Sequence, residues 1–149
     1  MKKNLSKKGF TLIEVLLVIV IIAILAAIVI VAINPGRQIS QANNTQRRSD
    51  VQTILNAVHQ YGIDNRGTLP AGITDAALVI GDAVTEANIC GDLVPTYIAA
   101  MPFDPTVTDG AYTSCAAYYT GYTIMTDANG RVVVDAPSAE LTETISVTR

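Results

Sequence analysis

The feature that most constrains this chain is an unbroken apolar run near its N-terminus. Residues 15–33 are nineteen consecutive Val, Leu, Ile and Ala residues, and Phe10–Ile13 extend the run backwards across a single carboxylate, Glu14. At about 1.5 Å per residue, a helix of this length covers most of a hydrocarbon core of about 30 Å. We therefore expect a membrane-spanning helix.

The residues before this run are basic, which bears on topology. Four lysines precede Gly9, namely Lys2, Lys3, Lys7 and Lys8. Basic residues stay on the cytoplasmic side, so we expect residues 1–9 in the cytoplasm and the remainder outside. The run is too long for a cleaved secretory signal peptide, and no small-x-small site closes it. On physical grounds alone, a plain signal anchor explains the segment about as well as any more specific class.

A short motif separates these alternatives. Gly9-Phe10-Thr11-Leu12-Ile13-Glu14, leading into the apolar run, resembles the prepilin signature of type IV pilins and type II secretion pseudopilins. The resemblance implies that a membrane prepilin peptidase cuts after Gly9 and methylates the new amine of Phe10. It also implies that Glu14 pairs with the Phe10 amine of a neighbouring subunit and so registers it during assembly.

The same resemblance implies an α+β fold. Residues 10–34 would form the helix that lies first in the membrane and later in the filament core. Residues 35–149 would form the head, in which a helix over 37–62 packs on an antiparallel sheet of three or four strands within about 112–147. The apolar run lacks the Gly and Pro that break this helix in several bacterial pilins, so no melted segment is expected within it.

The helical pattern has one break and one buried stripe. Pro35 cannot donate a backbone hydrogen bond and disfavours helical geometry at Asn34, which predicts a break there. Apolar residues at steps of three and four within 51–61 predict one buried face, and Gly62 is a plausible helix stop. Residues 41–46 are polar nearly all round, so we expect a weakly packed neck, and Arg47 and Asp50 are placed on the polar face.

The second half of the chain becomes β-like. Residues 71–100 form a mixed connection, with possible short helices at 75–83 and 95–100. Asp127-Ala128-Asn129-Gly130 is a strong hairpin turn. The strands expected after residue 112 are 116–125, 131–135 and 141–147.

Cys90 and Cys115 are the only cysteines. Both fall outside the membrane in this topology, where disulfides persist, and no Cys-x-x-Cys pattern suggests zinc or thioredoxin chemistry. We expect them to pair, closing a loop that contributes roughly 3 kcal/mol. Two buried free thiols are the alternative.

No other residue set predicts catalysis or a cofactor. The single histidine, His59, lies beside the apolar stripe and has no nucleophile–acid arrangement around it. Loop carboxylates could bind calcium, as in some major pseudopilins, but no dense run of ligands occurs, so we predict no metal and solvated aspartates at Asp104, Asp109 and Asp127. A glycosylation sequon at Asn43 is short enough to arise by chance. Three tyrosines are expected to pack on a strand: Tyr118, Tyr119 and Tyr122.

The net charge limits the classes of partner that this chain is expected to bind. Without residues 1–9 the chain has six arginines, no lysine and thirteen carboxylates, a net charge of −7, which disfavours nucleic acid. We interpret the chain as a non-enzymatic type IV pilin precursor. Its expected partners are copies of itself, the prepilin peptidase and an inner-membrane assembly platform. It would reside first in the cytoplasmic membrane and then in an extracellular or periplasmic filament. A type II secretion pseudopilin, and a minor pilin acting in adhesion or DNA capture, are the alternatives.

Overall fold

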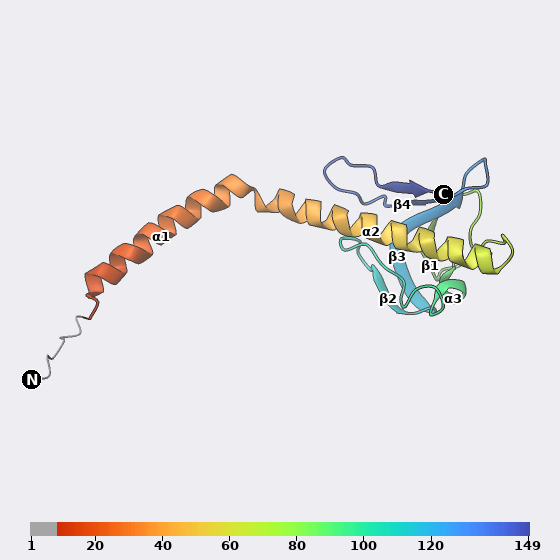
Figure 1. Ribbon diagram of the computed structural model, residues 1–149, viewed down its shortest axis with the longest axis horizontal. Helices are drawn as coiled ribbons and strands as arrows, with labels where there is room; N and C mark the ends of the chain where they lie inside the picture. The colour runs from red at the N-terminus through yellow and green to blue at the C-terminus, as the bar shows by residue number, and fades with distance from the viewer. Residues whose placement is uncertain (1–8) are drawn as a thin grey trace, which may run out of the picture. The chain divides into compact units, whose positions relative to one another are not determined.

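The computed structural model describes residues 9–149, and the expected leader, residues 1–9, lies outside this range except for Gly9. The chain divides after Gln38 into an N-terminal unit and a compact head, Ile39–Arg149 (Figure 1).

The N-terminal unit is built on helix α1, Leu12–Ile33. The helix starts where the Thr11 hydroxyl accepts a hydrogen bond from the backbone N–H of Glu14 at 3.3 Å, an N-cap that satisfies a free donor of the first turn. It ends because Asn34 adopts a left-handed conformation, with φ of 42°. Helix α2, Pro35–Asp64, begins at the next residue, so the predicted break at Asn34 is confirmed.

The end of α2 differs from the prediction. Gly62 does not stop the helix, which continues to Asp64. The chain instead turns at Arg66 and Gly67, whose φ angles are 56° and 89°. The Gly67 N–H donates to the carbonyl of Gly62 at 2.7 Å, which closes the helix with a left-handed cap.

The head contains one antiparallel sheet, which confirms the α+β class, but the sheet has five strands where three or four were expected. Its strand order is β1-β3-β4-β5, and β2 pairs with the N-terminal end of β3, residues 117–119. The strands are β1 (Leu78–Gly81), β2 (Ala111–Ser114), β3 (Ala117–Thr126), β4 (Val132–Asp135) and β5 (Ser146–Thr148). The long strand β3 and the hairpin to β4 match the sequence prediction, and the Gly130 N–H closes the turn on the Asp127 carbonyl at 2.9 Å.

Three local predictions were wrong. Residues 75–83 hold strand β1 in place of a helix, because the four residues Leu78–Gly81 pair with β3. The short helix of the connecting region is α3, Cys90–Leu93, and it ends before residues 95–100. The alternating residues 141–145 form a loop, since Leu141 and Thr142 both have positive φ, and β5 starts only at Ser146.

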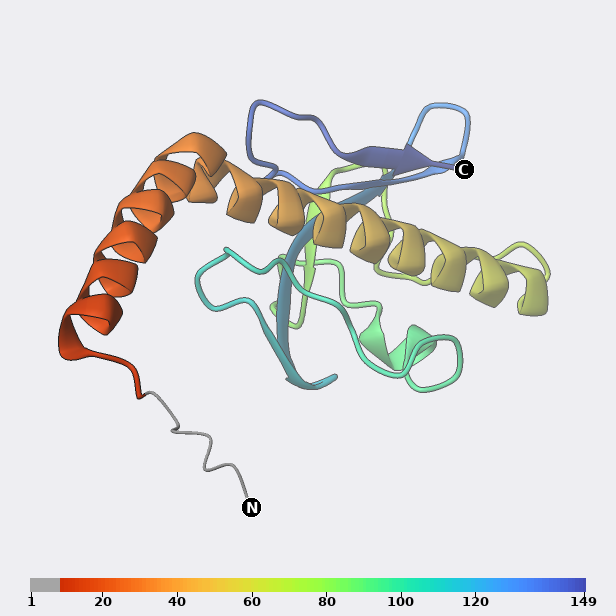
Figure 2. The same ribbon diagram turned by 60° about the vertical axis from the view of Figure 1, so that its left-hand side comes forward.

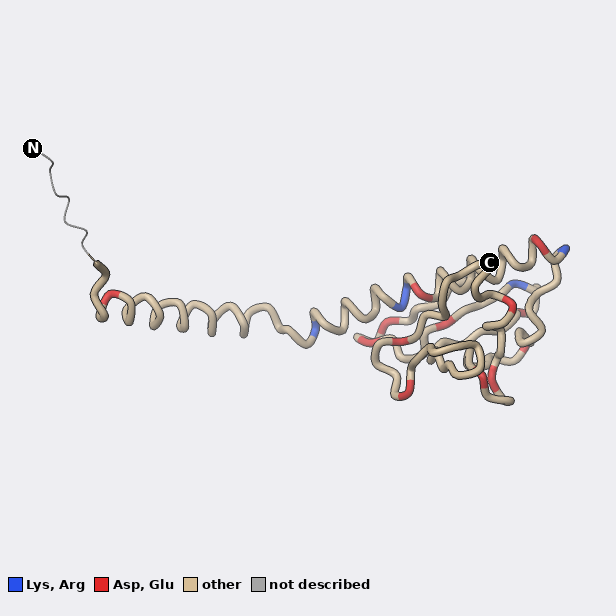
Figure 3. Tube along the Cα trace, turned by 90° about the horizontal axis from the view of Figure 1, so that it is seen from below, with Lys and Arg blue, Asp and Glu red and all other residues tan. Residues whose placement is uncertain are grey.

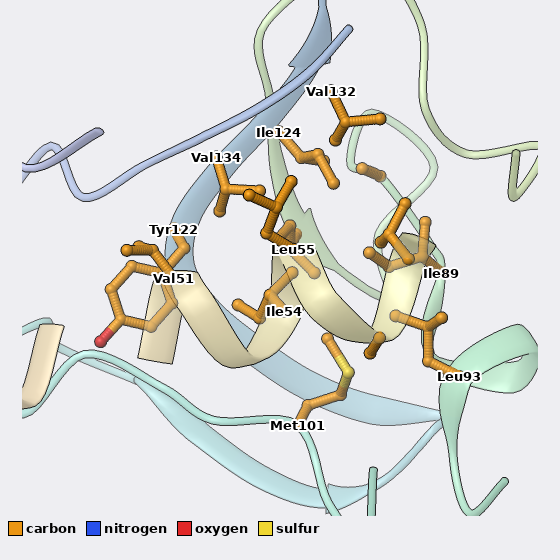
Figure 4. Close-up of a cluster of buried hydrophobic side chains, with 14 of the residues drawn as sticks. Val51, Ile54, Leu55, Ile89, Leu93, Met101, Tyr122, Ile124, Val132 and Val134 are labelled. Atoms are coloured by element: carbon orange, nitrogen blue, oxygen red, sulfur yellow. The ribbon is translucent and has the colours of Figure 1, made fainter. Parts of the chain in front are cut away.

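The core of the head lies between α2 and the sheet (Figure 4). The predicted stripe of α2 is buried, with Val51, Ile54 and Val58 at 0% exposure. It packs in one cluster with side chains from β3 and β4, and residues from the connecting region close the cluster. The labelled members of these two groups are Tyr122, Ile124, Val132 and Val134 from the sheet, and Ile89, Leu93 and Met101 from the connection.

Candidate functional site

The segment around the expected cleavage point is exposed and non-helical. Gly9 and Phe10 precede α1 without regular structure, and the Phe10 side chain is 83% exposed. Gly9, Phe10, Thr11 and Glu14 line a shallow hollow. The bond between Gly9 and Phe10 therefore lies in an exposed segment outside α1.

Glu14 lies in the first turn of α1, where a negative charge favours the positive end of the helix dipole by about 0.3–1 kcal/mol. Within residues 9–149, no cation forms an ion pair with it. It is therefore a carboxylate on an otherwise apolar helix, and in a nonpolar environment such a charge is costly until it finds a partner.

Helix α1 presents apolar side chains on all sides. None of its residues is buried in the described structure, and its length and composition are sufficient to cross a bilayer. Charged residues gather on the head, while the long run of α1 beyond its first turn carries none (Figure 3). A helix that is hydrophobic all round belongs inside a membrane or a packed assembly.

A disulfide joins Cys90 and Cys115, with 5.3 Å between their Cα atoms. Cys90 is the first residue of α3, and Cys115 lies in the turn between β2 and β3. The bond therefore ties the connecting region to the β2–β3 hairpin.

A buried ion pair links α2 to the loop before β2, and it was missed at the sequence level. Arg47 was placed on the polar face and Asp104 was expected to be solvated, yet both side chains are at 0% exposure. Arg47 Nε donates to Asp104 Oδ2 at 2.6 Å, and Nη2 donates to Oδ1 at 3.0 Å. The guanidinium also donates to Asn44, Thr106 and Glu140, so every N–H group of its side chain has a hydrogen-bond acceptor.

The hydrogen bonds of this ion pair shift the pKa values of both Arg47 and Asp104. Burial by itself would raise the pKa of Asp104, but hydrogen bonds from Arg47 and from the backbone and hydroxyl of Thr106 outweigh it, and the net pKa is lowered. The hydrogen bond to Asp104 raises the pKa of Arg47 against the opposing effect of burial. Both groups therefore stay charged at neutral pH.

Asp50, the other residue wrongly placed on the polar face, is 5% exposed. It accepts hydrogen bonds from the Tyr122 hydroxyl at 2.7 Å and from Gln46 Nε2 at 2.8 Å. Burial raises its pKa, only partly offset by these two donors, and the negative charge of Asp104 adds to the effect. Burial and the Asp50 hydrogen bond in turn raise the pKa of Tyr122.

The expected neck is also packed, contrary to prediction. Asn44 is fully buried, and Ser40 and Asn43 both hydrogen-bond to Glu140 in the loop between β4 and β5. The helical period could have indicated that Arg47 and Asn44 are buried. Stepping back from Val51 by three or four residues leads to Arg47 and then to Asn44, so the buried stripe continues with polar residues.

The remaining candidates lie apart from one another. His59 is half-buried, and its Nε2 atom has no hydrogen-bond partner within the described residues. Asp127 pairs with Arg131 at the hairpin, and Asp109 is exposed. The amide of Asn43, the sequon residue, is bound to Glu140.

The three tyrosines lie on β3, with Tyr118 and Tyr122 buried and Tyr119 half-buried. In the described range, 9–149, no group of three His, Cys, Asp or Glu residues is placed to hold a metal.

Comparison with known families identifies the N-terminal segment. Residues 4–30 match the family model described as a prokaryotic N-terminal methylation motif. Searches of curated proteins and of solved structures found no match. The motif and α1 together fit a single-pass membrane protein, and the motif implies processing by a prepilin peptidase. The chain therefore carries the prepilin-type methylation motif of type IV pilins and pseudopilins.

Proposed function

We propose that this chain is the precursor of a structural subunit of a type IV pilus filament. The observation that carries the proposal is the continuity of the methylation motif with a helix that has no buried residue. The head has its own core, whereas no residue of α1 is buried in the described chain. Assembly with other copies supplies that cover.

Processing is the first proposed step. The peptidase cuts the Gly9–Phe10 bond on the cytoplasmic side and methylates the Phe10 amine. Residues 10–34 then remain in the membrane, and residues 35–149 form the head outside. The exposed, non-helical setting of Gly9 and Phe10 supports this step, since the bond is reachable without unwinding α1.

Registration of subunits is the second proposed step. Cleavage creates a positive amine at Phe10, four residues before Glu14. In an apolar filament core, each charge is costly alone and strongly attracted to the other. Pairing of a Glu14 carboxylate with a Phe10 amine of an adjacent subunit therefore favours one axial offset between the two subunits over other offsets. Side-by-side packing of the α1 helices provides the remaining stabilisation.

A type II secretion pseudopilin is the second candidate. The residues at the end of the α2 stripe and after it, Tyr61, Asp64-Asn65 and Leu69-Pro70, resemble the helix exit of pilins and major pseudopilins. Together with Asp104-Pro105 they slightly favour a pseudopilin, whereas the disulfide favours a pilin. In the structure Asn65 Nδ2 donates to the Tyr61 carbonyl at 2.9 Å and Tyr97 donates to Asp64 at 2.9 Å, so this exit is an ordered unit. The two candidates share processing and assembly and differ in the filament that the subunit builds.

A cleavage experiment tests the shared step. Membranes from cells expressing the chain together with a prepilin peptidase are analysed by intact-mass spectrometry. The expected mass begins at Phe10 and includes one added methyl group. Gly9→Val is expected to leave the leader attached, whereas Ser6→Val, a matched change within the leader, should be processed normally. Processing of Gly9→Val at the same bond and rate would contradict the proposed site.

A further inference from the structure

The first turns of α2 inside the head bury no apolar side chain. The buried residues of α2 before Val51 are all polar: Asn44, Arg47 and Asp50. Ile39, the apolar residue of this stretch other than alanine, is 62% exposed. The anchoring of residues 40–46 to the head therefore rests on hydrogen bonds.

Most of these bonds go to one loop, residues 137–145 between β4 and β5, which we call the strap. Figure 2 shows the strap reaching from the sheet to the N-terminal half of α2. Its base is closed by the Ala136 N–H, which donates to the Ile145 carbonyl at 2.9 Å, and both residues are buried. The base therefore stays in place whether or not the rest of the strap contacts α2.

Glu140 makes the central contacts of the strap. Its carboxylate accepts from Ser40 Oγ and Asn43 Nδ2, each at 2.8 Å, and from Arg47 Nη1 at 2.9 Å. Its backbone forms a two-point pair with the Asn44 amide, which donates to the Glu140 carbonyl at 2.8 Å and accepts from its N–H at 2.9 Å. One residue of the strap thus binds two turns of the helix.

The strap is held in an unfavourable backbone conformation. Leu141 and Thr142 follow Glu140 and have φ angles of 58° and 56°. Two consecutive left-handed residues with side chains are disfavoured, and such geometry persists where surrounding contacts impose it. Release of Glu140 from α2 removes those contacts and lets the strap relax.

We infer that Glu140 and the strap form a releasable latch that sets where α2 becomes anchored to the head. With the latch closed, anchoring begins at Ser40. With it open, anchoring begins at Arg47, which keeps its separate ion pair with Asp104. The difference is about two helical turns, or roughly 10 Å of helix.

The segment freed by opening has little helical stability of its own. Residues 40–46 read Ser-Gln-Ala-Asn-Asn-Thr-Gln, in which Ser, Asn and Thr are poor helix formers. Helices of this kind are marginal in water without tertiary packing. Opening the latch therefore lengthens the part of α2 that is not anchored to the rest of the head. This inference does not depend on the filament role.

Amide hydrogen exchange of the full chain in detergent micelles tests the latch. Glu140→Ala removes the three carboxylate contacts and leaves the backbone pair with Asn44. Glu143→Ala is the matched control, since Glu143 lies in the same strap and its carboxylate pairs with the exposed Arg48. In Glu140→Ala we expect exchange of amides 40–46 to accelerate about tenfold or more, because hydrogen bonds to a charged group are lost. Amides 51–61 should keep their protection.

Three outcomes would overturn the latch. The first is unchanged exchange of amides 40–46 in Glu140→Ala. The second is equal acceleration of amides 40–46 and 51–61, which indicates a loss of stability of the whole head. The third is the same local acceleration in Glu143→Ala, which would show that the effect is not specific to the contacts of Glu140.

Discussion

Replacing Arg47 with methionine should be among the most damaging single changes in the head. Methionine has a similar length and fills the buried space, so the main effect is electrostatic. Arg47 donates two hydrogen bonds to Asp104, and both side chains are at 0% exposure. Without the guanidinium, the Asp104 carboxylate is left buried with donors from Thr106 alone.

The magnitude follows from this stranded charge. Removing one partner of a buried pair costs about 3–5 kcal/mol. A domain of this size has a free energy of unfolding of roughly 5–15 kcal/mol, so Arg47→Met should remove a large fraction of it. In contrast, Arg48 is 55% exposed and pairs with a partly exposed Glu143. Arg48→Met is thus a matched control at the next residue, expected to cost about 1 kcal/mol or less.

Urea unfolding of the full chain in detergent micelles provides the measurement. The sequence has no tryptophan, and its six tyrosines all lie in the head, so near-ultraviolet circular dichroism reports the unfolding of the head. The double variant Arg47→Met/Asp104→Asn removes both charges and should be more stable than Arg47→Met alone. Equal stabilities of Arg47→Met and Arg48→Met would show that the buried Asp104 charge is not costly, as would a double variant less stable than the single one.

Three further predictions concern other parts of the chain. Glu14→Val and Glu14→Gln should both insert into the membrane but lower the ratio of sheared-filament protein to membrane protein, and normal ratios would mean that Glu14 only starts a helix. Peptide mapping without reductant should recover Cys90 and Cys115 as one crosslinked pair, and alkylation of both in native protein would contradict it. Asp50 has a raised pKa, so its contribution to folding stability is largest below its ordinary pKa of 3.8 and is lost as the pH rises through the folded value. Asp50→Asn lacks this loss, so its free energy of unfolding relative to the parent chain should be greater at pH 7 than at pH 4 in urea titrations. The same difference between variant and parent at both pH values would contradict a buried, charged carboxylate at position 50.

The elements that sequence predicted best are those with a strong local signal. The apolar run, the Asn34–Pro35 break, the stripe at 51–58 and the Asp127–Gly130 turn each depend on neighbouring residues. The polar contacts of α2 could not be found in this way. Arg47 meets partners 57 and 93 residues away, and polarity alone placed it on the surface.

The strap misled the sequence reading for a related reason. Residues 141–147 alternate between apolar and polar side chains, which favours a strand. Contacts of Glu140 with α2, about 95 residues earlier, hold the loop in left-handed geometry that alternation does not reveal. Tertiary contacts thus overrode a local pattern.

Mass spectrometry of filaments sheared from cells that express this chain tests the proposed role most directly. We expect the chain to be present in these filaments, to begin at Phe10, to carry a methylated amine and to depend on Gly9 for its incorporation. Filaments that contain the chain with residues 1–9 still attached, or processed chain that never leaves the membrane, would contradict it.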